Sequence, residues 1–583
     1  MKQQIENLIK ETLKNLNIED VNFSIEHPTD FNNGDYSANI AMICAKQLKT
    51  NPKELAEKIV FELKNLISHP DKGEVGGGLS KIEIAGPGFI NFYLSREFFA
   101  DSVKDILEKG DDWGKNKILE GKKVMVEYTD MNPFKPFHIG HLMANTIGES
   151  ISRVVEFSGA NTLRANYQGD VGPHVAKAIY GILNSEEYLN GGFSNIKGSV
   201  SEIANWIGGC YSKGSNYYDT DENAKKEIDI LNKKIYDKSD EKINQIYDWG
   251  RKITLEAFEE IYEILGTKFS NGCYFFESVM APIGEKVVRE NVPNVFTESD
   301  GAIVFKGEDY DKKLHTRVFI TSQGLPTYET KEIGLTITKF EQENPDISIV
   351  TTAIEQAEYM KVVQKAISLI HSDYENRMKH VTHGMMRFAS GKMSSRTGNV
   401  VTGLSLLNDS IEIVLDKMKE RELPIEEKKK IGEVVGVSAL KYSILKSSLG
   451  SDIIYDFEKS ISFEGDSGPY LQYTSVRANS ILNKAKEFNT DDKKEVPENV
   501  TELEKYLYQF PEVVEHSYEK LEPHHIATYL TELASSFNTF YGNTQILVGE
   551  NKYMAYHLNL IKAFTQTMKN GLWLLGIEIP ERM

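Results

Sequence analysis

One local pattern occurs three times in this chain: an apolar stretch of strand length, then a loop, then a helix. Residues 123–128 (KVMVEY) precede a Pro-rich loop and a helix at 139–158. Residues 162–167 (TLRANY) precede a Gly-Asp-Val-Gly loop and a helix that begins at Pro173, and residues 347–353 (ISIVTTA) lead into a third helix. Such alternation predicts a doubly wound α/β domain, a parallel sheet with helices on both faces.

The first 115 residues follow a different pattern, in which helices surround a pair of strands. Gly86-Pro87-Gly88 is a strong turn signal because Pro fixes φ and Gly permits positive φ. The expected strands on either side are 81–85 and 89–94, and the expected helices are 3–16, 35–48, 52–66 and 97–109. With the polar bridge 111–115 as its boundary, residues 1–115 are expected to form a small α+β domain.

The rest of the chain divides into two further regions. Residues 116–437 carry the β-loop-α pattern, an additional expected strand at 380–388, and a polar, mostly helical insertion near 185–312. In residues 438–583, apolar residues recur at helical spacing, which predicts an α-helical bundle. Its expected helices are 439–447, 468–485, 501–510, 523–541 and 553–574.

Composition places the chain among soluble intracellular proteins. No window approaches the roughly 20 apolar residues needed to cross a bilayer, and the first residues lack a signal-peptide core. Cys44, Cys210 and Cys273 form no CxxC pair, so we expect a reducing cytoplasm and neither a zinc site nor another metal site. The net charge of −19 does not favour nucleic-acid binding, but binding depends on local fields, so the total charge leaves the question open.

The central motif is His138-Ile139-Gly140-His141, which follows a predicted strand and opens a predicted helix. A helix N-terminus offers unpaired N–H groups and a positive dipole end to phosphate. Both imidazoles could donate to phosphate oxygens, and Gly140 could let a nucleotide base approach the backbone. The alternative is four common residues at an ordinary helix start.

A second motif is the loop 391–399 (GKMSSRTGN), which is basic, rich in small residues and bounded by glycines. Such a loop could close over a polyphosphate and bring Lys392 and Arg396 to charge that grows as pyrophosphate leaves. Alone it could be a solvated basic turn. Together, in this order and on these elements, the two motifs favour ATP binding.

HIGH followed by KMSSR resembles the paired signatures of class I aminoacyl-tRNA synthetases, and the surrounding sequence is similar to the arginyl-tRNA synthetase family in particular. The segments that carry this resemblance are 127–138 (EYTDMNPFKPFH), 34–39 (GDYSAN), 85–92 (AGPGFINF), 468–473 (GPYLQY) and 571–583 (GLWLLGIEIPERM). The resemblance covers essentially the whole chain. It implies a Rossmann-like catalytic domain, an N-terminal domain that contacts the tRNA and a C-terminal anticodon-binding bundle.

The implied function is that of an arginine–tRNA ligase. ATP, entering with Mg²⁺, would activate L-arginine to arginyl-adenylate, and the arginyl group would pass to the terminal adenosine of tRNA(Arg). We expect no membrane partner and a monomer. The alternatives are another class I synthetase and a noncatalytic tRNA-binding protein derived from one.

One departure from the class pattern lies within the loop, where Ser395 stands at a position that the class fills with lysine. Arginyl enzymes with this feature carry a lysine just before HIGH, and Lys135 is at that place. The resemblance therefore implies that Lys135 supplies the missing positive charge. An ordinary exposed lysine is the alternative.

Four residues match family positions that hold the amino acid: Asn132, Tyr328, Glu332 and Gln356. A guanidinium carries five N–H donors, so it calls for a carboxylate with flanking acceptors. Tyr328 and Glu332 are one helical turn apart and could face one pocket. The family has an aspartate where Glu332 stands, so this position is a departure.

In the predicted bundle, Tyr470, Tyr473 and Arg477 recur at spacings of three and four residues. Aromatic rings and Arg can stack on unpaired bases, such as those of an anticodon loop. Packing of the tyrosines into the core of the bundle is an equally good interpretation.

Overall fold

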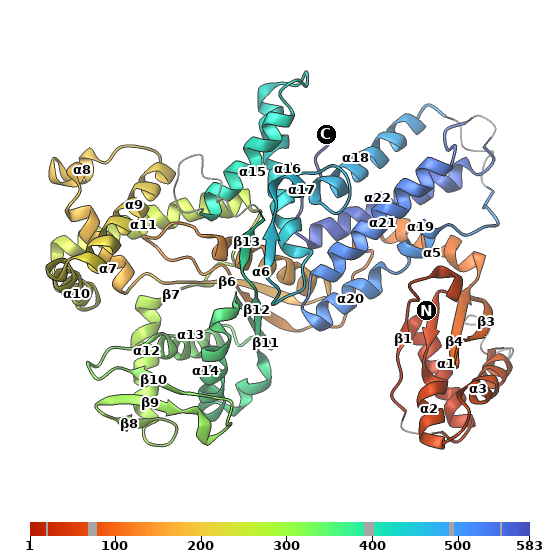
Figure 1. The fold of residues 1–583 in the computed structure, drawn as a ribbon, viewed down its shortest axis with the longest axis horizontal. Coiled ribbons are helices and arrows are strands. Elements are labelled where there is room, and N and C mark those ends of the chain that lie inside the picture. The colour runs from red at the N-terminus through yellow and green to blue at the C-terminus, as the bar shows by residue number, and fades with distance from the viewer. Residues whose placement is uncertain (19–20, 68–77, 390–401, 489–494, 549–550) are drawn as a thin grey trace. The chain divides into compact units, whose positions relative to one another are not determined.

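The computed structural model describes residues 1–18, 21–67, 78–389, 402–488, 495–548 and 551–583, and the chain divides into two compact units (Figure 1). The first unit comprises Met1–Trp113, Arg477–Glu512 and Thr531–Asn570. The second comprises Gly114–Val476, Val513–Leu530 and Gly571–Met583.

The first unit contains an antiparallel sheet with the order β1-β2-β4-β3. Its elements are β1 (Ile25–Glu26), β2 (Tyr36–Ala38), β3 (Leu79–Ala85), β4 (Phe89–Leu94), α1 (Lys2–Asn15), α2 (Ile40–Leu48), α3 (Pro52–Ile67) and α5 (Arg96–Lys109). The expected helix at 35–48 is wrong at its start. Tyr36 and Ala38 both point into the core and pair with β4 as a strand, so the helix begins only at Ile40.

Residues from the C-terminal part of the chain complete the core of this unit. Tyr508, just after α19 (Glu502–Leu507), is buried in the same hydrophobic cluster as Tyr36. The Tyr36 hydroxyl donates to Glu512 Oε1 at 2.6 Å, and Glu504 pairs with Arg96 at 2.5 Å. The residues before Trp113 and the segment Arg477–Glu512 therefore share one core.

The second unit is organised by a five-stranded sheet in which every pair is parallel. Its order is β12-β11-β5-β6-β7. The strands are β5 (Lys123–Glu127), β6 (Asn161–Gln168), β7 (Tyr274–Phe276), β11 (Ile347–Ala353) and β12 (Met378–His383). The order reverses between β5 and β11, and in open parallel sheets ligands bind outside the carboxyl ends of the strands at such a point.

Helices cover both faces of this sheet, because successive residues of an extended segment point to opposite sides. Glu127 pairs with Lys339 of α13 (Tyr328–Gln342). The next residue, Tyr128, packs against α6 (Ile139–Phe157), where a Cβ on Gly148 would lie 2.2 Å from the Tyr128 Cβ. α13 and α6 therefore lie on opposite faces, which confirms the doubly wound fold.

The segment 185–312 is less purely helical than expected. It contains α8 (Glu186–Leu189), α9 (Val200–Thr220), α10 (Glu222–Asp237), α11 (Glu241–Ile264), α12 (Glu277–Glu290), β8 (Thr297–Ser299) and β9 (Ala302–Lys306). It also contains β7, the edge strand of the parallel sheet. Three residues are too few for a periodicity, and β7 is set by its pairing with β6. β8 and β9 form an antiparallel sheet with β10 (Thr316–Ile320).

The expected strand at 380–388 is interrupted. β12 ends at His383, and a separate strand, β13 (Met386–Phe388), pairs in parallel with β14 (Ile453–Tyr455). The break falls at Gly384, where a Cβ would lie 2.2 Å from the Ser451 carbonyl oxygen. A close approach between two backbones therefore separates the strands.

The remaining helices are α7 (Pro173–Leu183), α14 (Ala357–Ile370), α15 (Gly403–Lys417), α16 (Ile425–Leu445), α17 (Phe457–Ser460), α18 (Gly468–Ala485), α20 (Phe510–Lys520), α21 (His524–Asn543) and α22 (Met554–Leu574). α18, α21 and α22 lie within a few residues of their expected positions. The helix expected at 439–447 begins much earlier, at Ile425, and α15, α17 and α20 were not expected from the sequence.

In the second unit, the end of the chain packs against α6. The buried Ser150 hydroxyl donates to the Leu574 carbonyl oxygen at 2.8 Å. Arg153 donates from Nη1 to the Trp573 carbonyl oxygen at 2.9 Å, and its guanidinium lies 5.1 Å from the centre of the Trp573 ring. The polar face of α6 is thus satisfied in part by the last residues of the chain.

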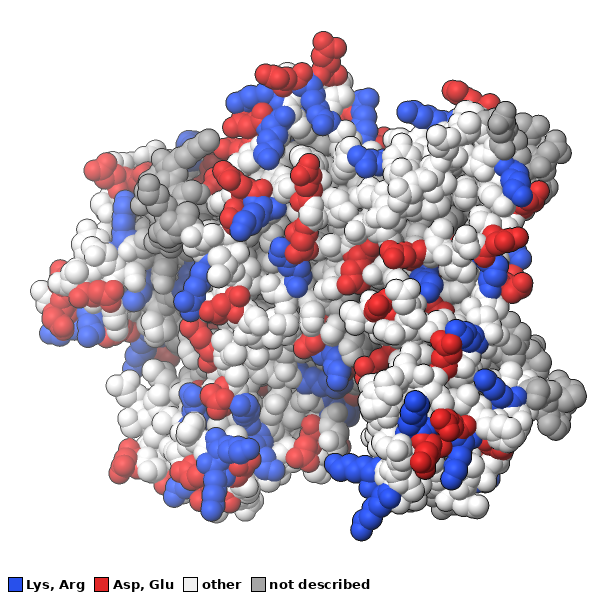
Figure 2. All heavy atoms as spheres, turned by 45° about the vertical axis from the view of Figure 1, so that its right-hand side comes forward, with Lys and Arg blue, Asp and Glu red and all other residues white. Residues whose placement is uncertain are grey.

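The surface carries charges of both signs. On the face drawn in Figure 2, Lys and Arg side chains are interspersed with Asp and Glu side chains over the described residues. Among the described helices, none combines the length and the apolar character that a membrane span needs.

Candidate active site

The first half of the site is the start of α6, where His138 and His141 cap the helix reciprocally. The backbone N–H of His138 donates to Nδ1 of His141, and the backbone N–H of His141 donates to Nδ1 of His138, both at 3.3 Å. The two rings stack with their centroids 3.4 Å apart. Because each Nδ1 is an acceptor, the single proton of each neutral ring lies on Nε2, which remains a donor.

Both rings are neutral at physiological pH. Burial lowers the pKa of His138 to about 4, with a smaller effect from the positive charge of Lys135. Burial also lowers the pKa of His141 well below its usual range, helped by His138 and Lys135. The start of α6 therefore presents two neutral Nε2–H donors together with the positive end of the helix dipole.

Gly140 has a local role in this arrangement. A Cβ on Gly140 would lie 3.0 Å from the Cε1 and Nδ1 atoms of His138. The glycine therefore makes room for the His138 ring, and the expected approach of a nucleotide base stays a prediction.

The second ATP motif falls outside the described residues, so the structure gives no position for Lys392 and Arg396. The chain is described again from Thr402, and the backbone N–H of Gly403 donates to the Phe137 carbonyl oxygen at 2.9 Å. A Cβ on Gly403 would lie 2.8 Å from the His138 carbonyl oxygen. The chain that leaves the KMSSR loop thus begins α15 directly against HIGH.

The segment between β5 and α6 has a strained backbone. Thr129, Asp130 and Phe134 have φ values of 79°, 52° and 68°. Positive φ is costly for a β-branched residue such as Thr129 and is found where surrounding contacts enforce it. One such contact is the hydrogen bond from the Asn145 amide to the Thr129 hydroxyl at 2.9 Å, with both residues buried.

The second half of the site is a cluster of carboxylates next to the carboxyl end of β5. Glu127, Asp130 and Glu332 interact electrostatically with one another, and Lys339 is the cation that faces them. Lys339 pairs with Glu127, and both side chains are 2% exposed. Three carboxyl groups face one ammonium, so the cluster becomes net negative when they are ionised, which suits a cationic ligand.

The cluster holds protons more tightly than isolated carboxyl groups do. Burial, followed by the charge of Glu127, raises the pKa of Glu332 to about 8. The same two causes raise the pKa of Asp130 well above its usual range. Asp130 also accepts a hydrogen bond from the Tyr167 backbone N–H at 2.9 Å, which fixes its carboxyl group. A cation bound here would favour the ionised carboxylates.

The other predicted arginine-binding residues lie around this cluster. Tyr328 begins α13 and is 62% exposed, with the Lys331 Nζ atom 5.1 Å from the centre of its ring. Lys331 pairs with Glu277 at 2.6 Å, and both side chains are buried. Tyr328 therefore lies exposed beside the Glu277–Lys331 pair, one helical turn before Glu332 on α13.

Asn132 is held against the end of β6. A Cβ on Gly169 would lie 2.2 Å from the Asn132 Oδ1 atom and 3.3 Å from the Glu277 Oε1 atom. Gln356 ends the 3₁₀ helix that follows β11 and is exposed. The structure thus places Asn132, Glu332 and Gln356 along the same edge of the sheet.

The proposed base-stacking residues lie on α18 and are half-buried. Tyr473 makes an edge contact with Phe463 at a centroid distance of 6.3 Å. Arg477 donates to the Asn538 side chain at 3.1 Å. These contacts leave both interpretations of Tyr470, Tyr473 and Arg477 open.

Several residues that the sequence reasoning missed belong to the site. They are Glu127, Asp130, Lys339, Tyr359, Glu277 and Lys331. Glu127 and Asp130 lie within the segment 127–138 that carries the family resemblance, so their position in the chain could have indicated them. Lys339 and Tyr359 are recognised only from their burial beside Glu332.

A parallel sheet with this order, two imidazole donors on the helix after its first strand, and a helix that begins against the same helix start a few residues after the second motif in the sequence are together typical of class I aminoacyl-tRNA synthetases. Comparison with known families narrows this class. Residues 102–457 match a family described as "tRNA synthetases class I (R), catalytic domain". Residues 471–583 match the "DALR anticodon binding domain", and residues 3–94 match the "Arginyl tRNA synthetase N terminal domain".

Similar proteins cover the whole chain. The arginine–tRNA ligase of Clostridium perfringens is 31% identical, with 99% of each chain covered, and that of Clostridium beijerinckii is 32% identical, with 100% covered. The solved arginyl-tRNA synthetase of Thermus thermophilus has a TM-score of 0.80 at 22% identity, covering 100% of each chain. That of Plasmodium falciparum has a TM-score of 0.78 at 21% identity, covering 100% of this chain and 99% of its own.

The chain belongs to the arginyl-tRNA synthetase family, whose members are aminoacyl-tRNA ligases. The expected fold is confirmed: a class I catalytic domain with an N-terminal domain and a helical C-terminal domain of the DALR type. The expected function is confirmed at the level of the family. The domain boundaries at 115/116 and 437/438 stay predictions.

Proposed function

We propose that this chain activates L-arginine with ATP and transfers the arginyl group to the 3′-terminal adenosine of tRNA(Arg), with the residues of the carboxyl edge of its parallel sheet in the roles described here. The observation that carries the proposal is that one short loop connects a site suited to a cation with a site suited to phosphate. Residues 128–138 join a cluster of carboxylates at one end to a pair of neutral imidazole donors at the other.

In the first step, an oxygen of the arginine carboxylate attacks the α-phosphorus of ATP. A P–O bond forms, the bond to pyrophosphate breaks, and the arginyl-adenylate remains. The Nε2–H groups of His138 and His141 donate to phosphate oxygens as negative charge develops on them. Because the rings are neutral, they stabilise this charge by hydrogen bonding and need not gain or lose a proton.

Cations complete the phosphate site. Lys135 is half-buried beside the imidazoles, with its Nζ atom 5.5 Å from the centre of the Tyr211 ring, and it lowers the pKa of both histidines. Lys392 and Arg396 approach from the KMSSR loop, which leads into α15 against HIGH. Mg²⁺ bound to ATP would supply further positive charge at the departing pyrophosphate. We assign no protein ligand to it.

Arginine binds through its two positive groups. The guanidinium meets the carboxylate of Glu332, with the exposed Tyr328 one helical turn away, and its planar fork of donors matches a carboxylate with flanking acceptors. Asn132 and Gln356 bind the amino-acid end, which must face the phosphates for the reaction to occur. Because its pKa is raised, the Asp130 carboxyl group adds negative charge between these two regions only when the bound cation favours its ionised form.

In the second step, a hydroxyl of the terminal adenosine attacks the carbonyl carbon of the adenylate. The ester bond forms, the bond to the phosphate oxygen breaks, and AMP leaves. The matching of residues 471–583 to an anticodon-binding family supports contact of this region with the tRNA. Tyr470, Tyr473 and Arg477 are the proposed stacking residues, and the monomeric state and cytoplasmic location stay predictions.

Arginine-dependent exchange of pyrophosphate into ATP, with and without tRNA(Arg), tests the proposal, followed by charging of the tRNA. We expect exchange with arginine and none with lysine, which has a point charge in place of a planar fork. Citrulline, the neutral relative of arginine, should also be inactive. Exchange that prefers another amino acid, or charging that never occurs, would contradict the proposal.

A further inference from the structure

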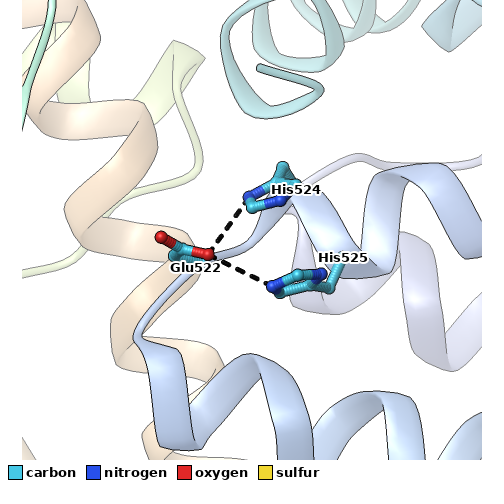
Figure 3. Close-up of side chains that lie close together, drawn as sticks. All are labelled: Glu522, His524 and His525. Atoms are coloured by element: carbon cyan, nitrogen blue, oxygen red, sulfur yellow. Dashed lines mark hydrogen bonds and ion pairs between the residues drawn. The ribbon is translucent and has the colours of Figure 1, made fainter. Parts of the chain in front are cut away.

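A compact group of three side chains lies far along the chain from the ATP and arginine residues, at the turn between α20 and α21. Glu522, His524 and His525 each offer one ligand atom, and these atoms all lie within 4.8 Å of one another. Figure 3 shows the two imidazoles at the first turn of α21, both turned toward the Glu522 carboxylate. All three residues belong to the second unit.

The distances suit a small metal ion. Oε2 of Glu522 is 3.1 Å from Nε2 of His525 and 3.8 Å from Nδ1 of His524. With metal–ligand bonds of about 2.0–2.2 Å, two ligands of a tetrahedral zinc ion lie about 3.4 Å apart. The two separations from Glu522 bracket this value, and the imidazole nitrogens lie within 4.8 Å of each other, so side-chain movements of about an ångström or less would bring the three atoms into one coordination sphere.

The turn that carries these side chains is held in place by its own backbone. The Glu522 N–H donates to the Ser517 carbonyl oxygen at 3.0 Å, and the Ser517 hydroxyl donates to the Glu522 carbonyl oxygen at 3.0 Å. Ser517 is fully buried. Leu521, with a φ of 56°, reverses the chain just before the first ligand. The ligand positions are therefore preorganised.

Hydrogen bonding within the cluster does not account for all three side chains. The contact between His525 and Glu522 is a good hydrogen bond, and a carboxylate at the start of α21 is also favoured by the helix dipole. Nδ1 of His524, however, is shielded from solvent and has no hydrogen-bond partner. Burying such an atom without a partner is costly, and an ion between the three groups would satisfy it.

We propose that Glu522, His524 and His525 bind a divalent transition-metal ion of the zinc class, in a site separate from the catalytic one. Two imidazoles and a carboxylate are a donor set that zinc accepts, with a fourth position left for water. A third imidazole, that of His516, lies beside the site with its centroid 4.4 Å from that of His525. The ion adds positive charge to the helical domain of a chain whose net charge is −19.

No metal was expected from the sequence because only its three cysteines were weighed as metal ligands. Those residues are buried and free, and none lies in this cluster. The two histidines and the glutamate lie within four consecutive residues, Glu522-Pro523-His524-His525. Spacings of one and two residues do not form a recognised zinc-binding motif, so the sequence alone did not indicate this site.

The test uses the untagged full-length protein after dialysis against a chelator. Equilibrium dialysis with Zn²⁺ should give one tightly bound ion per chain. The single variants His524→Gln, His525→Gln and Glu522→Gln should each lower the affinity by about tenfold or more, since loss even of a residue that only orients a ligand costs about 10–100-fold. The matched control is His315→Gln, which changes an exposed histidine in another part of the chain and should bind Zn²⁺ as the parent does.

Co²⁺ provides an independent readout, because its visible absorption reports tetrahedral coordination. The parent should show this absorption, and the double variant His524→Gln/His525→Gln should lose it while its circular dichroism spectrum is unchanged. No saturable Zn²⁺ uptake by the parent would overturn the proposal. Uptake and absorption that persist in the double variant would place the ion elsewhere and would overturn it equally.

Discussion

His138 and His141 each accept, at Nδ1, a hydrogen bond from the backbone N–H of the other. This exchange couples the start of α6 to the protonation of both rings. Protonating either Nδ1 would break one capping bond, so the fold of the helix start selects the neutral ring with its proton on Nε2. The same bonds that begin the helix thereby prepare two donors for phosphate.

We predict that His138→Asn and His141→Asn fold normally but slow activation. Asn is a good helix N-cap, so the first variant should keep the helix start. Loss of one preorganised donor to developing charge costs about 10²–10³ in rate. Pyrophosphate exchange measures this loss, with thermal unfolding as the check on folding. Rates within a few-fold of the parent would remove these residues from the mechanism.

Lys135→Ala should lower kcat for pyrophosphate exchange and change KM for ATP little. The reason is that Lys135 meets charge that grows as pyrophosphate leaves, so its contribution is larger in the transition state than in the bound substrate. Lys392→Ala should behave in the same way. A change confined to KM would show that these lysines hold only the ground state. An exposed control, Lys313→Ala, should change neither constant.

Glu332→Gln should weaken arginine binding by about a hundredfold or more. It keeps the shape of the side chain and removes its charge, and breaking a buried charge pair costs about 3–5 kcal/mol, at roughly 1.4 kcal/mol per decade. Glu329→Gln and Glu355→Gln are the comparators. Glu329 already pairs with Arg317 at 3.3 Å, and Glu355 is exposed. A silent Glu332→Gln beside an impaired comparator would show that the pocket is assigned wrongly.

The pKa of Glu332, about 8, gives this site a pH dependence. Arginine needs the ionised carboxylate, so its affinity should rise as pH increases from about 6.5 to 8.5, with release of a proton on binding. Glu332 is faced by Asp130, Glu127 and Lys339, so the protonation of Glu332 depends on the charges of these three groups.

The stability of the free protein should change with pH in the opposite sense to the arginine affinity. A carboxyl group with a raised folded-state pKa costs stability as pH rises from its unfolded value through 8, and Glu332→Gln should abolish that loss. Calorimetry and thermal unfolding across this range check both signs.

Gly169→Ala should impair arginine binding more than folding. The added Cβ would lie 2.2 Å from Oδ1 of Asn132, the end of a side chain that can rotate away. The expected result is a raised KM for arginine, similar to that of Asn132→Ala, with KM for ATP nearly unchanged. Normal arginine kinetics in Gly169→Ala would show that Asn132 does not hold the amino acid.

Lys339→Met should destabilise the protein strongly, because it leaves the Glu127 carboxylate buried without its partner. The expected loss is about 3–5 kcal/mol, and Glu127→Gln/Lys339→Met should recover part of it. Lys361→Met, which breaks an exposed pair with Glu358, is the matched control and should change stability by less than about 1 kcal/mol. Urea unfolding measures all three. A mild effect of Lys339→Met would mean that water or another group compensates Glu127.

The sequence predicted the start of α6 well because the capping residues are themselves part of the motif. It predicted four of the five strands of the parallel sheet, since each is at least five residues long and three of them precede a loop and a helix. β7 was not predicted, because three residues are too few to show the alternation of a strand, and only the pairing with β6 makes them one. The strand Tyr36–Ala38 was not predicted for a similar reason, because its extended conformation depends on pairing with β4.

For the candidate site, the motifs indicated the residues proposed to bind phosphate and much of the proposed amino-acid site. It could not supply the balance of charge around Glu332, which depends on how deeply Asp130 and the Glu127–Lys339 pair are buried. Depth of burial is a property of the packed domain. The position of Lys392 and Arg396 still rests on the sequence alone.

The hydrogen bonds from Ser150 and Arg153 to the carbonyl oxygens of Leu574 and Trp573 have a consequence for synthesis on the ribosome. α6 leaves the ribosome well before the partners of its buried hydroxyl and of its arginine, which lie 424 and 420 residues further along the chain. The helix that begins with HIGH therefore reaches its final packing only after Leu574 has been translated. A chain that stalls before Trp573 carries every residue proposed here to act in catalysis and still lacks the segment that fastens α6, so arginine activation should appear abruptly once that segment has left the ribosome.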